Sequence, residues 1–202
     1  MLKLVLATNN KGKVKELAAM LQPLGFQVVP IGSYPGFQEV EEDGETFQAN
    51  AIKKAVAAAE FTGELSLADD SGLEVDALAG APGVHSARFA GEPTDDAANN
   101  RKLLALLEGV PAEKRTARFR CVIAIAEPSG NNQTADGTCE GIILREQKGE
   151  GGFGYDPLFY VPEYRQTFAE LASAKKNAIS HRGRALGKAL EILNRLYANR
   201  EG

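Results

Sequence analysis

The stretch Leu67-Ala68-Asp69-Asp70-Ser71-Gly72-Leu73 decides how this chain of 202 residues folds. Apolar residues lead into two adjacent carboxylates, so we predict a buried β-strand that delivers Asp69 and Asp70 at its carboxyl end. Two neighbouring carboxylates lose their hydration only at a high cost unless a cation lies between them. The stretch therefore favours a divalent-metal site with oxygen ligands, and Mg²⁺ is the simplest occupant. A solvated Asp-Asp turn that caps the next element is the alternative.

Upstream of this stretch, a polar loop lies between a predicted strand and a predicted helix. Residues 2–7 are almost continuously apolar, which is typical of an interior strand, and residues 14–21 have helical periodicity. The loop Thr8-Asn9-Asn10-Lys11-Gly12-Lys13 would aim backbone N–H groups at an anion. Its lysines, together with Lys15, place positive charge where the helix dipole disfavours it. A bound polyphosphate would offset that charge, and a solvated lysine-rich turn is the alternative.

An acidic run precedes the next predicted helix. Thr46 is a suitable N-cap for that helix, and Lys53 and Lys54 lie within it. Acids before a helix start are favourable electrostatically, so the helix dipole alone could explain them. The sharper alternative is that the run supplies a metal ligand that meets Asp69 and Asp70. The acids are Glu39, Glu41, Glu42, Asp43 and Glu45.

A second informative loop is glycine-rich and covers residues 149–157. Phe153 and Tyr155 supply flat faces on a backbone that the glycines leave free to turn. Beside Asp156, these rings suit stacking on a purine, with the carboxylate accepting hydrogen bonds from base N–H groups. The alternative is a tight turn whose aromatic rings fold into the core.

The C-terminal part of the chain reads as two helices. Thr167 and Glu170 have the spacing of a capping box, which predicts a short helix there. His181 and Arg182 stand at the start of the last helix and are hydrogen-bond donors. That helix carries an apolar stripe between residues 185 and 197, which is either core or a dimer face.

Composition restricts the class of protein. Hydrophobic residues make up 44% and charged residues 25%, which is typical of a globular chain, and the length suggests a single domain over residues 1–202 with room for two lobes. A net charge of −4 argues against binding to a nucleic-acid polymer. Cys121 and Cys139 lack zinc-ligand spacing and are expected in the core. The apolar start is too short for a signal peptide and no run could span a membrane, so we expect a cytoplasmic protein.

Five separated motifs resemble the inosine triphosphate pyrophosphatase family, the HAM1-like proteins that include the bacterial XTP/dITP diphosphatases. The resemblance implies an α/β, two-lobed fold around a long mixed β-sheet with flanking helices, an active-site groove between the lobes, and usually a homodimer. It also implies an enzyme that hydrolyses ITP, dITP and XTP to the monophosphate plus pyrophosphate and so cleanses the nucleotide pool. The motifs are Thr8-x-Asn10-x-x-Lys13-x-x-Glu16, Ala68-Asp69-Asp70-Ser71-Gly72-Leu73, Gly80-Ala81-Pro82-Gly83, Phe153-Gly154-Tyr155-Asp156-Pro157 and Ser180-His181-Arg182-Gly183.

The same resemblance assigns roles to single residues. Asp70 would be the general base, with Asp69 sharing the orienting work, and Ser71 would contact the substrate. Mg²⁺ would be held by Asp70 and Glu42, with Mn²⁺ able to replace it; Glu42 is preferred over Glu41 only by its distance to the helix start. The phosphates would be held by Thr8, Asn9, Asn10, Lys11, Gly12, Lys13 and Lys54. The base pocket would consist of Phe153, Gly154, Tyr155, Asp156, Lys176, His181 and Arg182.

Two other functions fit parts of the pattern. One is a nucleotide pyrophosphatase for pyrimidine or modified nucleotides, although the donors His181 and Arg182 favour the carbonyl of a purine. The other is a nucleotide-binding sensor without turnover. A sensor would gain nothing from the carboxylates of Glu42, Asp69 and Asp70 pointed at phosphates.

Overall fold

The structure is a computed structural model that describes residues 2–198. The strands are β1 (Leu2–Leu6), β2 (Phe26–Pro30), β3 (Ser66–Val75), β4 (Thr116–Ala126), β5 (Asn132–Ile143), β6 (Phe159–Val161) and β7 (Gln166–Thr167). The α-helices are α1 (Lys11–Leu21), α2 (Phe47–Thr62), α3 (Asp96–Leu106), α4 (Ser173–Ile179) and α5 (His181–Ala198). Short 3₁₀ helices occupy Gln22–Leu24, Ile31–Ser33, Asp76–Leu78, Gly83–Arg88 and Ala112–Lys114.

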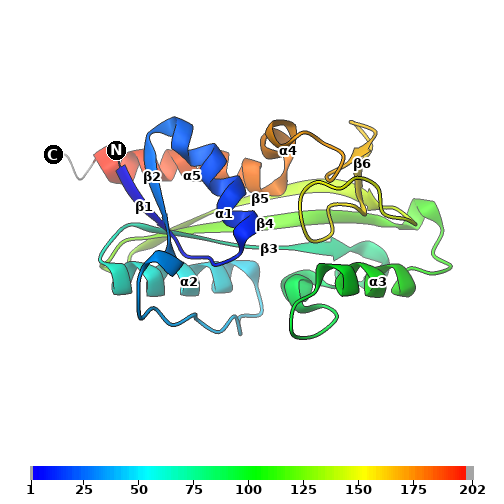
Figure 1. Cartoon of the computed structure of the whole chain (residues 1–202), viewed down its shortest axis with the longest axis horizontal. Helices are drawn as coiled ribbons and strands as arrows, with labels where there is room; N and C mark the ends of the chain where they lie inside the picture. The colour runs from blue at the N-terminus through cyan, green and yellow to red at the C-terminus, as the bar shows by residue number, and fades with distance from the viewer. Residues whose placement is uncertain (1, 199–202) are drawn as a thin grey trace. The chain divides into compact units, whose positions relative to one another are not determined.

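The strands form one mixed sheet in the order β2-β1-β3-β4-β5-β6-β7, with helices beside it (Figure 1). β1 pairs in parallel with β2 and β3, whereas β6 pairs antiparallel with β5 and β7. The predicted α/β class with a mixed sheet is therefore confirmed, and β1 has the interior position that its apolar sequence indicates.

The prediction that the paired acids end their strand is wrong. β3 continues for five residues beyond Asp70, to Val75. The residues after the acids include Leu73 and Val75, which are fully buried, so the strand keeps a core-facing set of side chains. Gly72 does not stop it, because its backbone stays within the sheet.

Two compact units divide the chain. Unit 1 consists of residues up to 70, 121–137 and from 182 onward; unit 2 consists of residues 71–120 and 138–181. The single domain over residues 1–202 and the groove between lobes stay predictions.

Unit 1 has helices on both faces of its strands, with α1 and α5 on one face and α2 on the other (Figure 1). Leu17 and Leu21 of α1 pack with Leu186 and Leu193 of α5 in one core cluster. The apolar stripe of the last helix therefore lies in the core of unit 1. α2 meets the other face through small residues, Ala51, Ala55, Ala58 and Ala59, which are fully buried.

Unit 2 has an aromatic core. The ring of Phe119 on β4 lies 4.7 Å from that of Phe159 and 5.7 Å from that of Phe168, measured between centroids. Leu103 of α3 and Ile179 of α4 belong to the same cluster. This core supports the glycine-rich loop that ends at residue 157.

The predicted helix starts have mixed outcomes. Thr46 caps α2 by accepting a hydrogen bond from the backbone N–H of Ala49. The capping-box bonds between Thr167 and Glu170 also form, at 2.8 and 3.2 Å, but the helix does not begin there: residues 168–170 form a turn and α4 begins at Ser173. Thr167 is held in β7, and the next backbone N–H, that of Phe168, donates to the carbonyl of Phe159. The carbonyl of Thr167 accepts from the N–H groups of Glu170 and Leu171, so the capping box closes a turn at this place.

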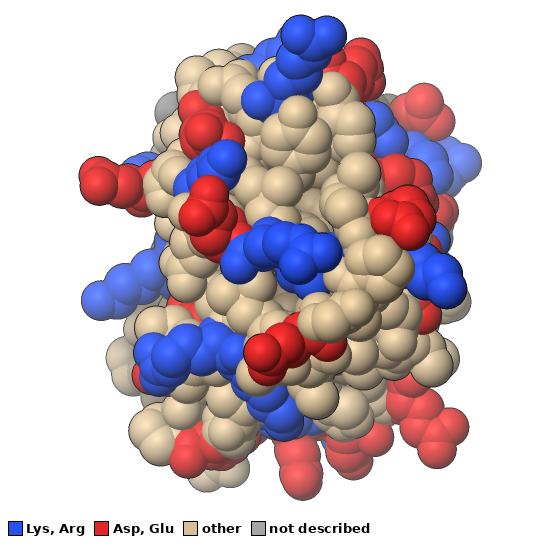
Figure 2. All heavy atoms as spheres, turned by 90° about the vertical axis from the view of Figure 1, so that its right-hand side faces the viewer, with Lys and Arg blue, Asp and Glu red and all other residues tan. Residues whose placement is uncertain are grey.

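The surface carries both signs of charge. On the face that Figure 2 shows, lysine and arginine side chains of the described residues are interspersed with aspartate and glutamate. Among the ion pairs of the described residues, Arg118 contacts Asp76 at 2.9 Å and Glu140 at 3.1 Å. Such a mixed face differs from the basic surface typical of nucleic-acid binders. Within residues 2–198, no helix combines the length and the apolarity needed to cross a membrane. Cys121 and Cys139 are buried, as expected of core residues.

Candidate active site

Asp69 and Asp70 are both buried but belong to different surroundings. Consecutive residues of a strand point to opposite faces of the sheet. Accordingly, the Asp69 side chain meets residues of α1 and α5, and the Asp70 side chain meets Lys54 of α2. Asp69 is 0% and Asp70 4% exposed, so neither belongs to a solvated turn. Lysine and arginine side chains compensate their charges from the two sides.

Three cations surround Asp69. The guanidinium of Arg182 donates to Oδ2 from Nε at 3.2 Å and from Nη2 at 3.1 Å, and Lys13 Nζ lies 3.3 Å from Oδ1. Burial alone would raise the pKa of Asp69, but Lys13, Arg182 and Lys54 outweigh it and hold that pKa well below its usual range. Asp69 is therefore a fixed negative charge at neutral pH. Arg182 also donates to Glu16 of α1 at 2.5 Å.

Asp70 shares one ammonium group with Glu42. Lys54 Nζ lies 3.6 Å from Asp70 Oδ1 and 3.1 Å from Glu42 Oε1, and it donates to the backbone carbonyl of Asp69 at 2.9 Å. Burial raises the pKa of Asp70; Lys54 and Lys13 oppose that rise and the charge of Glu42 adds to it. Neighbouring carboxyls thus have pKa values shifted in opposite directions.

Asn50 is a site residue that the sequence interpretation missed. Its side chain is 1% exposed, accepts a hydrogen bond from the N–H of Gly44 at 2.8 Å, and donates to the carbonyl of Gly44 at 3.3 Å. A hydrogen bond to Asp70 opposes the rise in the pKa of that carboxyl. Asn50 therefore links Asp70 to Gly44, which lies in the acidic run two residues after Glu42. An asparagine on the buried face of a predicted helix was the available signal.

The predicted phosphate loop caps α1. Asn10 is the N-cap and accepts from the N–H of Lys13 at 3.0 Å, while Thr8 Oγ1 accepts from the N–H of Asn10 at 3.2 Å. The first turn of a helix presents N–H groups that have no acceptor within the helix. Because Asn10 takes only one of them, the amides of Lys11 and Gly12 are available to an anion by position.

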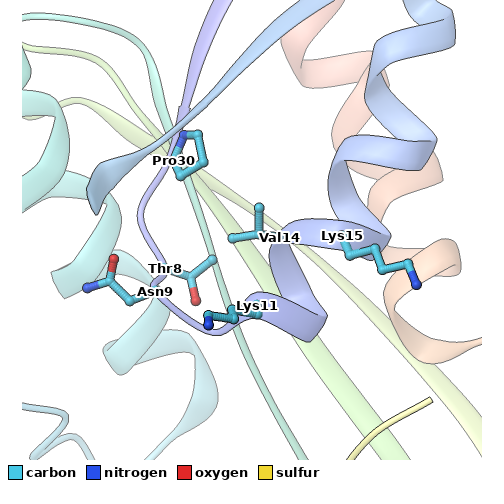
Figure 3. Close-up of a pocket in the computed structure, with 6 residues that line it drawn as sticks. All are labelled: Thr8, Asn9, Lys11, Val14, Lys15 and Pro30. Atoms are coloured by element: carbon cyan, nitrogen blue, oxygen red, sulfur yellow. The ribbon is translucent and has the colours of Figure 1, made fainter. Parts of the chain in front are cut away.

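A pocket of about 300 Å³ lies beside this loop (Figure 3). It is lined by Thr8, Asn9, Lys11, Val14, Lys15 and Pro30. In Figure 3 the side chain of Lys15 extends away from Thr8 and Asn9. The three lysines that the sequence grouped together are therefore distinct: Lys11 lies at the loop, Lys13 turns to Asp69, and Lys15 points elsewhere.

The donor set around Asp70 fits a hard divalent cation. Glu42 and Asp70 direct carboxylate oxygens at the same ammonium group, so the two oxygens approach one point. Mg²⁺ is commonly held by one or two carboxylates and completes its shell with water and phosphate oxygens. Within residues 2–198, no three His, Cys, Asp or Glu side chains are grouped as a larger ligand set. The residues present thus suit an ion that arrives with a phosphate.

In unit 2, Asp156 organises the aromatic loop. Its Oδ2 accepts a hydrogen bond from the N–H of Phe153 at 2.9 Å and pairs with Lys176 Nζ at 2.5 Å. Lys176 is 4% exposed and lies 5.0 Å from the centroid of the half-buried Phe153 ring. A Cβ on Gly152 would lie 1.9 Å from that Oδ2, so only glycine fits there. The loop presents a ring, an ammonium and a carboxylate together.

The other predicted base residues are placed differently from one another. Tyr155 is 4% exposed, and its hydroxyl donates to the carbonyl of Ser86 at 2.7 Å, so its ring lies in the core, as the alternative interpretation had it. His181 is buried and stacks on Phe119 with centroids 4.7 Å apart. Arg182 belongs to unit 1, where it contacts Asp69. Ser71 follows Asp70 in β3 and is half-buried.

Fold and site together define an α/β protein with a capped helix start after its first strand, buried carboxylates on β3 and an aromatic loop. A sequence model of the Ham1 family matches residues 4–192. The chain belongs to the Ham1 family. A dITP/XTP pyrophosphatase of Desulforamulus reducens is 78% identical over 200 residues, covering 99% of this chain and 100% of that protein. A protein of the same name from Geobacter sulfurreducens is 58% identical over 186 residues, covering 92% and 94%. The solved structure of a HAM1 protein from Coxiella burnetii has a TM-score of 0.86 at 45% identity, covering 96% of this chain and all of that one.

The two acids should differ in their contribution to stability. Asp69→Asn leaves buried cations without their counter-charge, and we expect it to lower the free energy of unfolding by about 3–5 kcal/mol. Asp70→Asn should cost less, because a carboxyl with a raised pKa is destabilised in its ionised form at neutral pH, and an amide is not. Urea denaturation at pH 7 measures both. Asp43→Asn removes an exposed partner of Lys53 and is the control expected to change little. Equal losses for Asp69→Asn and Asp70→Asn would contradict the difference in charge compensation.

Proposed function

We propose that this chain hydrolyses non-canonical purine nucleoside triphosphates, ITP, dITP and XTP, to the monophosphate and pyrophosphate, and so removes them from the nucleotide pool. The observation that carries the proposal is the placement of the two buried acids: Asp69 is paired with Lys13 and Arg182, whereas Asp70 lies beside Lys54 and Glu42, where burial raises its pKa. The dITP/XTP pyrophosphatases at 78% and 58% identity support the same substrate class.

In the proposed reaction, a water molecule attacks the α-phosphorus. The new bond joins the water oxygen to phosphorus, the bond to the pyrophosphate oxygen breaks, and Asp70 accepts the proton of the water. Lys54 and the first-turn amides of α1 neutralise the phosphate oxygens, which carry more charge in the transition state than in the substrate. Lys13, held beside Asp69, contributes to the same field.

Glu42 and Asp70 would hold Mg²⁺, or Mn²⁺ in its place. When bound, such an ion supplies Lewis-acid neutralisation of phosphate charge. Glu42 is assigned in preference to Glu41 because Glu42 shares Lys54 with Asp70, whereas Glu41 is exposed. Lys54 is itself positioned to contact either the two acids or the phosphates that they accompany.

Base recognition is assigned to unit 2. Phe153 offers a half-buried ring for stacking, and Lys176 offers an ammonium donor held by Asp156. A purine with a carbonyl at position six accepts from such a donor, whereas the amine of adenine leaves it unsatisfied. Arg182 pairs with Asp69 and acts as the counter-ion that fixes that carboxylate, and its part in the base pocket stays a prediction.

We further propose that the protein is a cytoplasmic homodimer. The location follows from the substrate, because nucleoside triphosphates are made and used there, and cell fractionation tests it. The dimer follows from the family resemblance. Analytical ultracentrifugation at micromolar concentration tests it, and a sedimenting species of one chain mass would refute it.

The decisive assay is release of pyrophosphate from ITP in the presence of Mg²⁺. We expect IMP and pyrophosphate in equal amounts. Binding of ITP without any product would indicate the sensor function instead. Faster turnover of a pyrimidine triphosphate than of ITP would indicate the other pyrophosphatase class.

Asp70→Asn should retain the fold and lose about 10²–10⁴-fold in kcat, because a general base contributes that much and an amide cannot accept the proton. Steady-state pyrophosphate release measures kcat, and circular dichroism confirms folding. A folded Asp70→Asn protein with the wild-type kcat would move the base to Asp69.

Activity should require a divalent cation, and Glu42→Gln should raise the Mg²⁺ concentration for half-maximal activity at least about tenfold, since a charged ligand is lost. Glu41→Gln is the matched control and should leave that concentration unchanged. Electron paramagnetic resonance of Mn²⁺ gives the affinity directly. Full activity after exhaustive EDTA treatment, or equal effects at both positions, would refute the assignment.

Lys176→Met should lower the ratio of kcat/KM for ITP to that for ATP about tenfold or more, because it removes the donor to the six-carbonyl and keeps the apolar stem. The loss should fall mainly on ITP. Lys175→Met is the control, since Lys175 is exposed on the same helix. If Lys176→Met weakens ITP and ATP equally, Lys176 does not contact the base.

A further inference from the structure

Helix α3 holds the aromatic loop through hydrogen bonds to Gly154. The N–H of Gly154 donates to Asp96 Oδ2 at 2.7 Å. The carbonyl of Gly154 accepts from Asn100 Nδ2 at 2.9 Å. Asp96 and Asn100 are four residues apart on α3 and so lie on the same face of the helix. One helix face therefore holds both polar groups of one residue.

These two contacts fix the peptide planes on either side of Gly154. The N–H lies in the plane shared with Phe153, and the carbonyl lies in the plane shared with Tyr155. Gly154 has a φ of +62°, a conformation that the chain adopts at little cost only with glycine. External contacts are therefore needed to select this conformation among the many open to glycine.

The orientation of the Asn100 amide follows from its partner. A carbonyl oxygen can only accept, so the nitrogen of the amide must face Gly154. Asn100 is 3% exposed, and a buried asparagine whose amide contacts the backbone across 54 residues of sequence holds a fixed geometry. Asp96 is exposed and stands in the first turn of α3, where a carboxylate is also favoured by the helix dipole.

We propose that Asp96 and Asn100 are positioning residues for base recognition, which act by holding Gly154 so that Phe153 and Asp156 are presented in one fixed arrangement. The inference rests on the proposed function of the loop as the base site. A loop fixed before binding loses less conformational freedom when the nucleotide arrives, so affinity for the base increases. Without the two hydrogen bonds to Gly154, the loop would sample other conformations and the discrimination between bases would fall.

The first test measures the hydrogen bond between the Gly154 N–H and Asp96. In Asp96→Ala, the amide hydrogen of Gly154 should exchange with solvent faster than in the wild type, as followed by NMR. Asp96→Asn keeps an oxygen acceptor and should restore the protection. Unchanged exchange in Asp96→Ala would show that the hydrogen bond does not hold the loop.

The second test measures the consequence for substrates. Asp96→Ala and Asn100→Ala should each raise KM for ITP about two- to tenfold, the effect of one hydrogen bond, with kcat on ITP nearly retained. The kcat/KM for ATP should change little, so the ratio of ITP to ATP falls. Asp96→Asn should recover most of that ratio. Because Asp96 is exposed, its variants test the inference even if Asn100→Ala does not fold.

Asn99→Ala is the matched control. Asn99 is the neighbouring buried residue of α3 and also makes two backbone hydrogen bonds, but to Ala87 and Ala90. It should lower stability and leave the ITP-to-ATP ratio unchanged. An equal fall in that ratio for Asn99→Ala, or an equal loss for both nucleotides in Asp96→Ala, would overturn the inference. A wild-type protein that does not hydrolyse ITP would instead refute the proposed function.

Discussion

The structure of unit 1 depends on neutralising one inaccessible charge. Asp69 is fully buried in a central strand, and an ion in that position costs several kcal/mol unless it is paired and hydrogen-bonded. Lys13 comes from α1 and Arg182 from α5, so the same carboxylate holds two helices against β3. Leu17 of α1 and Leu186 of α5 also belong to one apolar core cluster of unit 1. Removing the carboxylate of Asp69 would take away the negative charge that Lys13 and Arg182 share.

This arrangement gives the adjacent residues Asp69 and Asp70 different pKa shifts, although their side chains are chemically identical. The cations around Asp69 stabilise its ionised form, whereas burial and Glu42 destabilise the ionised form of Asp70. Pairs of titratable groups with pKa values displaced in opposite directions are typical of sites where one group holds charge and the other moves protons. Two consecutive residues are enough for this difference, because successive side chains of a β-strand point to opposite faces of the sheet and so meet different helices.

Local sequence patterns predicted the elements that depend on local interactions. The interior strand at residues 2–7, the first helix and the cap at Thr46 follow from hydrophobic period and capping chemistry, and all are present. The capping box at residues 167–170 forms but closes a turn and not a helix, because Thr167 belongs to β7 and the N–H of Phe168 donates to the carbonyl of Phe159. The sequence predicts that β3 ends at the two acids, but β3 continues to Val75, because cations from α1, α2 and α5 compensate their charges within the strand.

The missing information concerns partners that are distant along the chain. The sequence predicts that Arg182 donates to a ligand, but in the structure it donates to the carboxylate of Asp69, 113 residues away along the chain. Asn50, Asp96 and Asn100 are ordinary helix residues by local criteria, and their roles emerge only when tertiary contacts give them a backbone group to hold. The motif resemblance predicts the chemistry of the site, but the separate surroundings of Asp69 and Asp70 arise only from contacts in the folded chain.

The large sequence separation between Arg182 and its partner Glu16 also has a consequence for biosynthesis. Its partner Glu16 lies 166 residues earlier in the chain. At ~5–20 residues per second, a ribosome takes about 8–30 seconds to add that much polypeptide. During this time β1 and α1 have emerged without the helix that completes their core. Until α5 is synthesised, Leu17 and Leu21 lack the α5 side chains that share their core cluster, and apolar surface exposed in this way favours aggregation.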